Sequence, residues 1–148
     1  MLTSNLKLQK PLEEYIELFE KATPRSLLLY DPLLNEDFIF EDPYHKSLGI
    51  EGFKSLMLGR FGLYEKSIRD KSRLRYKVHD FIWGRRADVA YMYWSMIFTN
   101  VKGDKVEETS FEGMSEITLS KNGKVISQCD FWGRHDVFDV KGYQLLKL

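Results

Sequence analysis

The chain has 148 residues, a length typical of one domain and too short for two well-packed ones, so we expect a single domain over residues 1–148. It carries 22 Lys and Arg against 22 Asp and Glu. A neutral chain lacks the basic surface that binds nucleic acid or anionic membranes, so neither is expected as a partner. A single cysteine, Cys129, excludes a disulfide framework and a multi-cysteine metal site.

The amino terminus lacks the apolar core and the cleavage site of a secretory signal. The longest nearly apolar run, residues 89–98, is about half the length that a membrane helix needs. We therefore expect a cytoplasmic protein. Aromatic residues make up 14% of the chain, which suggests a ligand pocket or an oligomer interface in addition to a core.

Helical periodicity appears first along the chain. Apolar residues recur at spacings of three and four over residues 8–22. Thr23-Pro24 then predicts the start of a short helix that ends before Pro32. Residues 37–41 are expected to form a strand and residues 42–45 a loop. A third helix is predicted from Gly49 to about residue 65, because one stripe of it is apolar.

After residue 71 the period changes to two, which predicts strands over residues 74–82, 87–100, 106–120 and 125 to about 137. Turns are expected around Gly103 and at Asn122-Gly123. Helices followed by an antiparallel meander indicate the α+β class. We expect a strongly curved, mostly antiparallel sheet wrapped around three amino-terminal helices, a cone with an internal pocket.

The strand at residues 87–100 is apolar on both faces. Helices of the same chain can cover only one face, and an exposed apolar face of that length favours aggregation. The sequence therefore predicts a homodimer through the outer face of the sheet.

Three segments carry a resemblance to a known superfamily. They are the opening helix with Tyr15, the step Phe40-Glu41-Asp42-Pro43 before Gly49-Ile50-Glu51-Gly52-Phe53, and the segment from Asn122 to Trp132. With the element order over residues 8–140, they resemble the NTF2-like superfamily, and within it the SnoaL-like and ketosteroid-isomerase-like proteins. That fold hosts enzymes, binders and transport adaptors.

The resemblance implies roles for several residues. In ketosteroid isomerases the Asp of the Glu-Asp-Pro step is the general base, which matches Asp42. A first-helix Tyr, matched by Tyr15, and a protonated late-strand Asp form the oxyanion hole. This chain has Ser115 near the second position. SnoaL-type cyclases carry an acid-base Asp on the last strand, which matches Asp130, whereas Gln128 replaces their His.

The residues themselves leave alternatives open. Asp130, on a strand with Gln128 and Trp132, is either a pocket acid or a structural carboxylate bonded to an Arg or a helix end. Asp42 before Pro43 is either a pocket residue or a turn former. His45 can pair with Asp42 or reach the cavity mouth. The residues expected to line the pocket are Tyr44, His45, Phe53, Trp94, Phe111, Ser115, Gln128 and Trp132.

Three scattered histidines argue against a metal site, and no motif implies a cofactor. His79 and His135 are expected on the surface. The sequence predicts a protein that binds a small apolar or aromatic organic molecule in an aromatic-lined pocket. As an enzyme it would be an isomerase, cyclase or dehydratase that uses Asp42 or Asp130 as acid-base and Tyr15 as donor. The alternative is a non-catalytic ligand-binding or protein-interaction domain of the same fold.

Overall fold

The computed structural model of the protein describes residues 2–67 and 73–132, which form three helices and six strands. In chain order these are α1 (Leu2–Glu20), the 3-10 helix η1 (Pro24–Tyr30), β1 (Leu34–Glu41), β2 (Lys46–Leu48), α2 (Gly49–Ser67), β3 (Arg73–Trp83), β4 (Val89–Lys102), β5 (Lys105–Leu119) and β6 (Val125–Phe131). The composition is α+β, as the sequence predicts.

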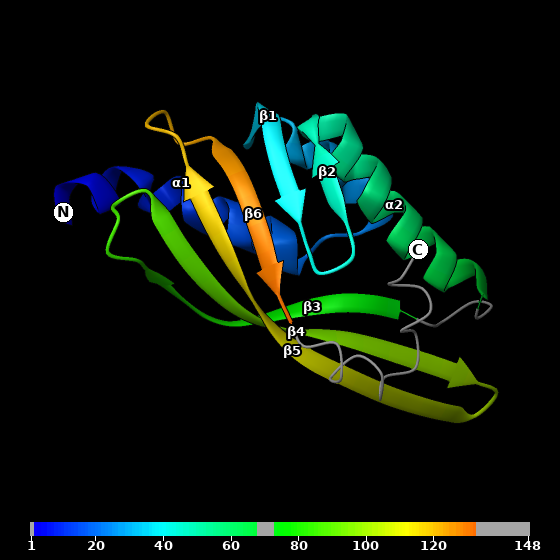
Figure 1. Ribbon diagram of the computed structural model, residues 1–148. Coiled ribbons are helices and arrows are strands. Elements are labelled where there is room, and N and C mark those ends of the chain that lie inside the picture. The colour runs from blue at the N-terminus through cyan, green and yellow to red at the C-terminus, as the bar shows by residue number, and fades with distance from the viewer. Residues whose placement is uncertain (1, 68–72, 133–148) are drawn as a thin grey trace.

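The strands form one mixed sheet in the order β2-β1-β6-β5-β4-β3 (Figure 1). The expected antiparallel meander is present from β3 to β6. Two features of the sheet were not predicted from the sequence. The short strand β2 pairs with β1, and its three residues are too few to show a period. β1 pairs with β6 in parallel, which is possible because the chain between them makes a long crossover.

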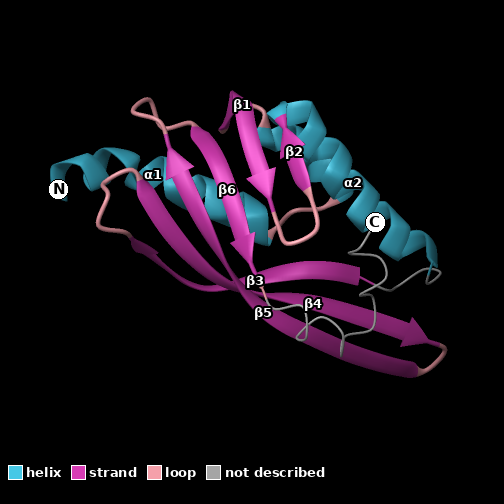
Figure 2. Ribbon diagram, in the orientation of Figure 1, coloured by secondary structure: helices cyan, strands magenta, loops and turns pink. Residues whose placement is uncertain are grey.

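The helices gather on one side of the sheet (Figure 2). Helix α1 packs against β3, and α2 packs against β1, β2 and β3. Helix α1 buries the apolar positions that the periodicity singled out, among them Leu12, Tyr15 and Phe19. It begins at Leu2, earlier than the expected residue 8, and contains Pro11. Within the described part of the chain, no helix is long and apolar enough to cross a membrane.

The two faces of β4 have different surroundings. Met92, Trp94, Met96 and Phe98, at most 1% exposed, face the helices. On the opposite face Tyr93 is half-buried, and its cross-strand neighbours include Met114, which in turn pairs with Phe131. Met114 and Phe131 are 44% and 55% exposed, so apolar surface remains open on the outer face of a single chain.

The last strand was expected to reach about residue 137. Strand β6 is described to Phe131, and residues 133–137, with His135, lie outside the described residues. His79 is exposed on β3, as expected, and its Nε2 lies 2.7 Å from Ser95 Oγ on β4.

Gly113 allows Trp94 to lie across β5. The two residues are cross-strand partners, and a Cβ added to Gly113 would stand 2.6 Å from Trp94 Cη2 and 3.1 Å from the Phe131 carbonyl oxygen. Trp94 is fully buried and cannot move aside without disturbing its neighbours. The missing side chain at position 113 therefore fixes where the indole sits.

We expect Gly113→Ala to lower the free energy of unfolding by about 1–3 kcal/mol, the usual cost of overpacking a core. Gly59→Ala is the control, because Gly59 lies in α2 with nothing within 4 Å of an added Cβ. That change should stabilise the protein by up to about 1 kcal/mol, since Ala is the better helix former. Urea unfolding of both variants measures the difference, and equal stabilities would contradict the packing argument.

Candidate functional site

Two acids meet at the carboxyl ends of β1 and β6. Because these strands are parallel and Glu41 stands opposite Cys129, the following residues Asp42 and Asp130 become neighbours. Both are buried, at 7% and 4% exposure. An open cleft of about 560 Å³ touches both acids, and its other lining residues are Glu41, Pro43, Cys129, Phe131 and Trp132.

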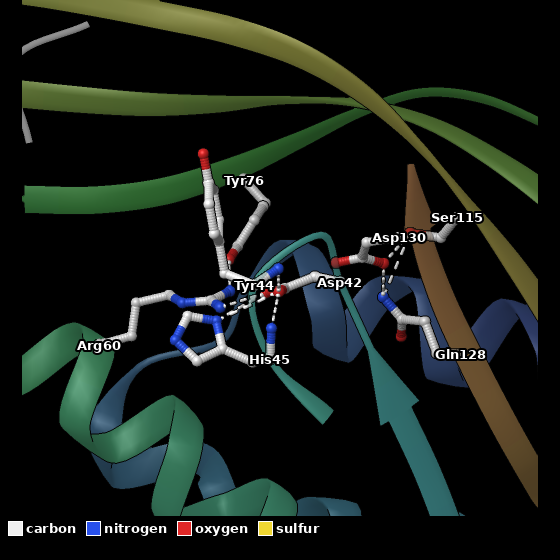
Figure 3. A network of polar contacts seen from close by, with 8 residues as sticks. All are labelled: Asp42, Tyr44, His45, Arg60, Tyr76, Ser115, Gln128 and Asp130. Carbon is white, nitrogen blue, oxygen red and sulfur yellow. Dashed lines mark hydrogen bonds and ion pairs between the residues drawn. The ribbon is translucent and has the colours of Figure 1, made fainter. Parts of the chain in front are cut away.

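Asp42 is saturated with hydrogen-bond donors (Figure 3). Its Oδ1 accepts from the backbone N–H groups of Tyr44 at 2.8 Å and His45 at 2.7 Å, and lies 3.1 Å from His45 Nδ1. Its Oδ2 accepts from Arg60 Nη2 at 2.7 Å. A carboxylate offers about four acceptor positions. Asp42 therefore both forms the turn and holds an ion pair, and its role as a general base stays a prediction that this geometry does not favour.

The partner of Asp42 is a buried arginine that the sequence analysis did not single out. The Arg60 side chain is 4% exposed, and its Nη1 donates to the Tyr76 hydroxyl at 3.3 Å. A signal for Arg60 exists in the sequence: it is a charged residue beside Met57 and Phe61 on the apolar stripe of α2. Tyr76 likewise carries a hydroxyl on the buried side of β3.

Among the described residues, hydrogen bonds hold only one oxygen of the Asp130 carboxyl. Its Oδ1 accepts from the Ser115 hydroxyl at 2.5 Å and from Gln128 Nε2 at 2.8 Å. No residue of the described ranges 2–67 and 73–132 donates to Oδ2. In Figure 3 this second oxygen points toward the side where Asp42 and Tyr76 lie. Ser115 and Gln128, which depart from the isomerase and cyclase patterns, are thus the residues that hold the acid.

Hydrogen-bond directions in this network are set by Trp94, which only donates, and by the Asp130 carboxylate, which only accepts. An indole N–H can only donate, and Trp94 Nε1 donates to Ser115 Oγ at 2.8 Å. Gln128 Nε2 also donates to Ser115, at 3.2 Å, so the serine hydrogen is left for Asp130. Because both Gln128 N–H bonds are then used, its Oε1 accepts from the Tyr15 hydroxyl. The hydroxyl hydrogen of Tyr15 is therefore already used in a bond to Gln128 within the protein.

Burial is the main cause of the pKa shifts of Asp130 and Tyr15. It raises the pKa of Asp130 to about 6, assisted by the nearby charge of Asp42 and opposed by the bonds from Ser115 and Gln128 and by the charge of Arg60. Burial also raises the pKa of Tyr15 well above its usual range, and Tyr30 and Asp130 add to the rise. Asp130 therefore changes protonation near pH 6, whereas Tyr15 keeps its proton.

Four aromatic side chains near the two acids contact one another in series. Trp132 contacts Tyr44 and Phe111, with centroids 5.3 and 5.6 Å apart, and Phe111 contacts Trp94 at 6.1 Å. Phe53 lies elsewhere in the core, against Tyr30 and Phe40. The structure therefore places Trp94, Phe111, Tyr44 and Trp132 in one chain of rings, while Phe53 packs under β1.

His45 pairs with Asp42, one of the two outcomes that the sequence left open. Its side chain is 12% exposed, and its Nε2 is buried with no hydrogen-bond partner in the described structure. Among residues 2–67 and 73–132, no group of three or more His, Cys, Asp or Glu side chains is arranged to hold a metal ion.

Comparisons with known proteins identify the fold. No family model and no curated protein matches the sequence. Solved structures match with 11–14% identity: an NTF2-like protein of unknown function from Exiguobacterium (TM-score 0.61, 84% of this chain and 98% of that chain), a steroid delta-isomerase from Pseudomonas aeruginosa (0.60, 95% and 85%) and a putative polyketide cyclase from Xanthomonas campestris (0.63, 89% and 94%). The predicted NTF2-like fold is confirmed. At these identities the likeness establishes the fold alone.

The buried Asp130 generates a prediction about stability. Its pKa rises from an ordinary value of 3.8 to about 6 in the fold, so between these values the folded chain binds more protons than the unfolded chain. The wild type therefore loses stability as pH rises through this window, by about 3 kcal/mol in total. In Asp130→Asn this loss disappears, because the amide cannot ionise while its oxygen still accepts from Ser115 and Gln128.

Urea unfolding from pH 4 to pH 8 measures the effect. The variant should become the more stable protein above about pH 6. Asp37→Asn, at an exposed position of β1, controls for the loss of one acidic side chain. A difference between Asp130→Asn and the wild type that does not change with pH would contradict the assignment.

Proposed function

We propose that the protein catalyses proton transfer on a small, mainly apolar organic molecule, with Asp130 as the acid-base group. The observation that carries the proposal is a buried carboxyl whose Oδ1 is fixed by Ser115 and Gln128 while its Oδ2 receives no bond from the described residues. A general base needs a fixed orientation, a free lone pair and a pKa near the working pH. Asp130 meets all three conditions.

The proposed chemistry requires no cofactor. Above about pH 6 the Asp130 carboxylate accepts a proton from a carbon next to a carbonyl group. The C–H bond breaks, its electron pair moves toward the carbonyl oxygen, and Asp130 returns the proton to the same or another carbon. Isomerisation, cyclisation and dehydration all contain such a step. The aromatic rings of Trp94, Phe111 and Trp132 would exclude water from it.

In this proposal the other predicted catalytic residues have supporting tasks. Asp42 binds Arg60 and the turn, and Tyr15 fixes the amide of Gln128. The fold is compatible with the chemistry, since proteins named as a steroid delta-isomerase and as a putative polyketide cyclase share it. Shared fold alone does not assign the activity.

A non-catalytic binding protein is the second candidate. The observation in its favour is that Asp42 and Tyr15, the groups that the isomerase resemblance would use, are both occupied by partners within the chain. In that case Asp130 would recognise a ligand hydroxyl or amine without moving a proton to carbon.

Deuterium exchange distinguishes the two candidates. We expect the wild type to speed exchange of the α-hydrogens of a small ketone such as 2-tetralone in D₂O, followed by proton NMR. Asp130→Asn should slow this by at least about 100-fold, the usual contribution of a general base. The wild-type rate should rise with pH and level off above about 6, because only the carboxylate accepts the proton. Asp37→Asn is the control.

If 2-tetralone binds, as protein chemical shifts would report, but neither the wild type nor Asp130→Asn speeds exchange above the rate in buffer, the protein is a binder. Exchange that is fast in both proteins would likewise remove Asp130 from the base role.

We also propose that the chain forms a homodimer through the outer sheet face, where Tyr93, Met114 and Phe131 form a cross-strand row. Light scattering should then give about twice the 17.5 kDa chain mass. Met114→Glu should shift the protein toward monomer, since it places a charge in the interface. Lys121→Glu, in the exposed turn after β5, is the control. A monomeric wild type would refute the proposal.

A further inference from the structure

We propose that Tyr76 is the hydrogen-bond donor that stabilises negative charge on the ligand opposite Asp130, and that the ligand is a neutral molecule whose oxygen gains that charge, such as a carbonyl compound that forms an enolate. This inference rests on the proposed function, because it supplies the second group that proton abstraction from carbon requires. It replaces Tyr15, whose hydrogen is used on Gln128.

The direction of one hydrogen bond carries the argument. A guanidinium has no acceptor atom, so Arg60 must donate and the Tyr76 oxygen must accept at 3.3 Å. The hydrogen of the Tyr76 hydroxyl is therefore free to donate. No acceptor for it lies among residues 2–67 and 73–132, and the side chain is 3% exposed. A buried hydroxyl hydrogen without an acceptor is costly unless a ligand takes it.

The cation beside Tyr76 makes it a stronger donor than a phenol buried without a cation. The charge of Arg60 and its hydrogen bond lower the pKa of Tyr76, although burial, with Asp130 and Asp42, raises it overall. A phenol polarised by a buried cation gives a stronger hydrogen bond to an oxyanion than a neutral one does. Arg60 cannot turn away, because Asp42 Oδ2 holds its Nη2 at 2.7 Å.

The ring of Tyr76 is held in place for this task. It packs against Phe19 at 4.4 Å and meets Trp94 edge-on at 5.7 Å. In Figure 3 the free oxygen of Asp130 points toward the side of the site that holds Tyr76 and Arg60. Tyr76 and Asp130 are near enough for their charges to interact. A ligand between them would meet a base on one side and a donor on the other.

Tyr30 provides a matched comparison in the same interior. Its side chain is fully buried, and its hydroxyl has no hydrogen-bond partner in the described structure. The charges that raise its pKa, after burial, come from Tyr76 and Asp130 and include no cation. Tyr30→Phe therefore removes the same atom from the same core without removing a cation-polarised donor.

The test measures equilibrium binding and not turnover. We use 4-nitrophenol, whose absorbance distinguishes phenol from phenolate, and Asp130→Asn as the parent protein, because the amide does not repel the phenolate. The parent should bind the phenolate more tightly than the phenol. Adding Tyr76→Phe should weaken phenolate binding by about 10-fold or more, the usual value of a hydrogen bond to a charged group. Adding Tyr30→Phe should change it less than about 2-fold.

Binding of 4-nitroanisole, which cannot ionise, controls for folding and should be equal in the three proteins. Equal phenolate binding with and without Tyr76, an equal loss in Tyr30→Phe, or no binding of 4-nitrophenol by the parent would each overturn the inference. A loss confined to Tyr76→Phe supports it. If deuterium exchange is also unaffected by Asp130→Asn, the donor is real and the proposed catalysis is what fails.

Discussion

The buried ion pair between Arg60 and Asp42 is the interaction on which the rest of the site depends. Moving two charges out of water is expensive, and the attraction between them offsets that cost only when their other hydrogen-bonding positions are filled. Here Asp42 also accepts two backbone N–H groups of its own turn, and Arg60 also donates to Tyr76. The pair therefore joins the end of β1, the middle of α2 and the start of β3 at one buried point. Removing either partner would leave an uncompensated charge, at a cost of about 3–5 kcal/mol.

The same pair makes two neighbouring acids unequal. Asp42 has a cation and a full set of donors, whereas Asp130 has two neutral donors on one oxygen. Burial then raises the pKa of Asp130 to about 6, and the nearby Asp42 charge adds to the rise. Two carboxyls side by side with different surroundings can take different tasks. In this protein the acid after β1 is held by its own turn and by Arg60, and the acid in β6 keeps one oxygen that no described residue donates to.

A second constraint starts at Trp94 and fixes the orientation of Asp130. The indole lies over Gly113 because no Cβ occupies that space, and this brings its N–H to Ser115. Since the indole only donates and the Asp130 carboxylate only accepts, the bonds through Ser115, Gln128 and Tyr15 each take one direction. The departures from the isomerase and cyclase patterns at Ser115 and Gln128 are consistent with this network. Where those patterns have an Asp and a His, which titrate, this chain has a hydroxyl and an amide, which orient Asp130 by hydrogen bonds.

The sequence by itself determined the local structure, because that depends on periodicity and on turn residues. Alternation and helical spacing predicted the helices, the long strands and the buried faces, and the Asn122-Gly123 turn placed β6 beside β5. Asp42 and Asp130 were found from a resemblance that spans short segments. The tertiary structure alone decided that β1 pairs with β6 in parallel, which makes the two acids neighbours across 88 positions of chain. It also decided that Arg60 and Tyr76 belong to the site. A charge on an apolar stripe signals that a partner exists, but long-range packing selects the partner, and no local pattern encodes that choice.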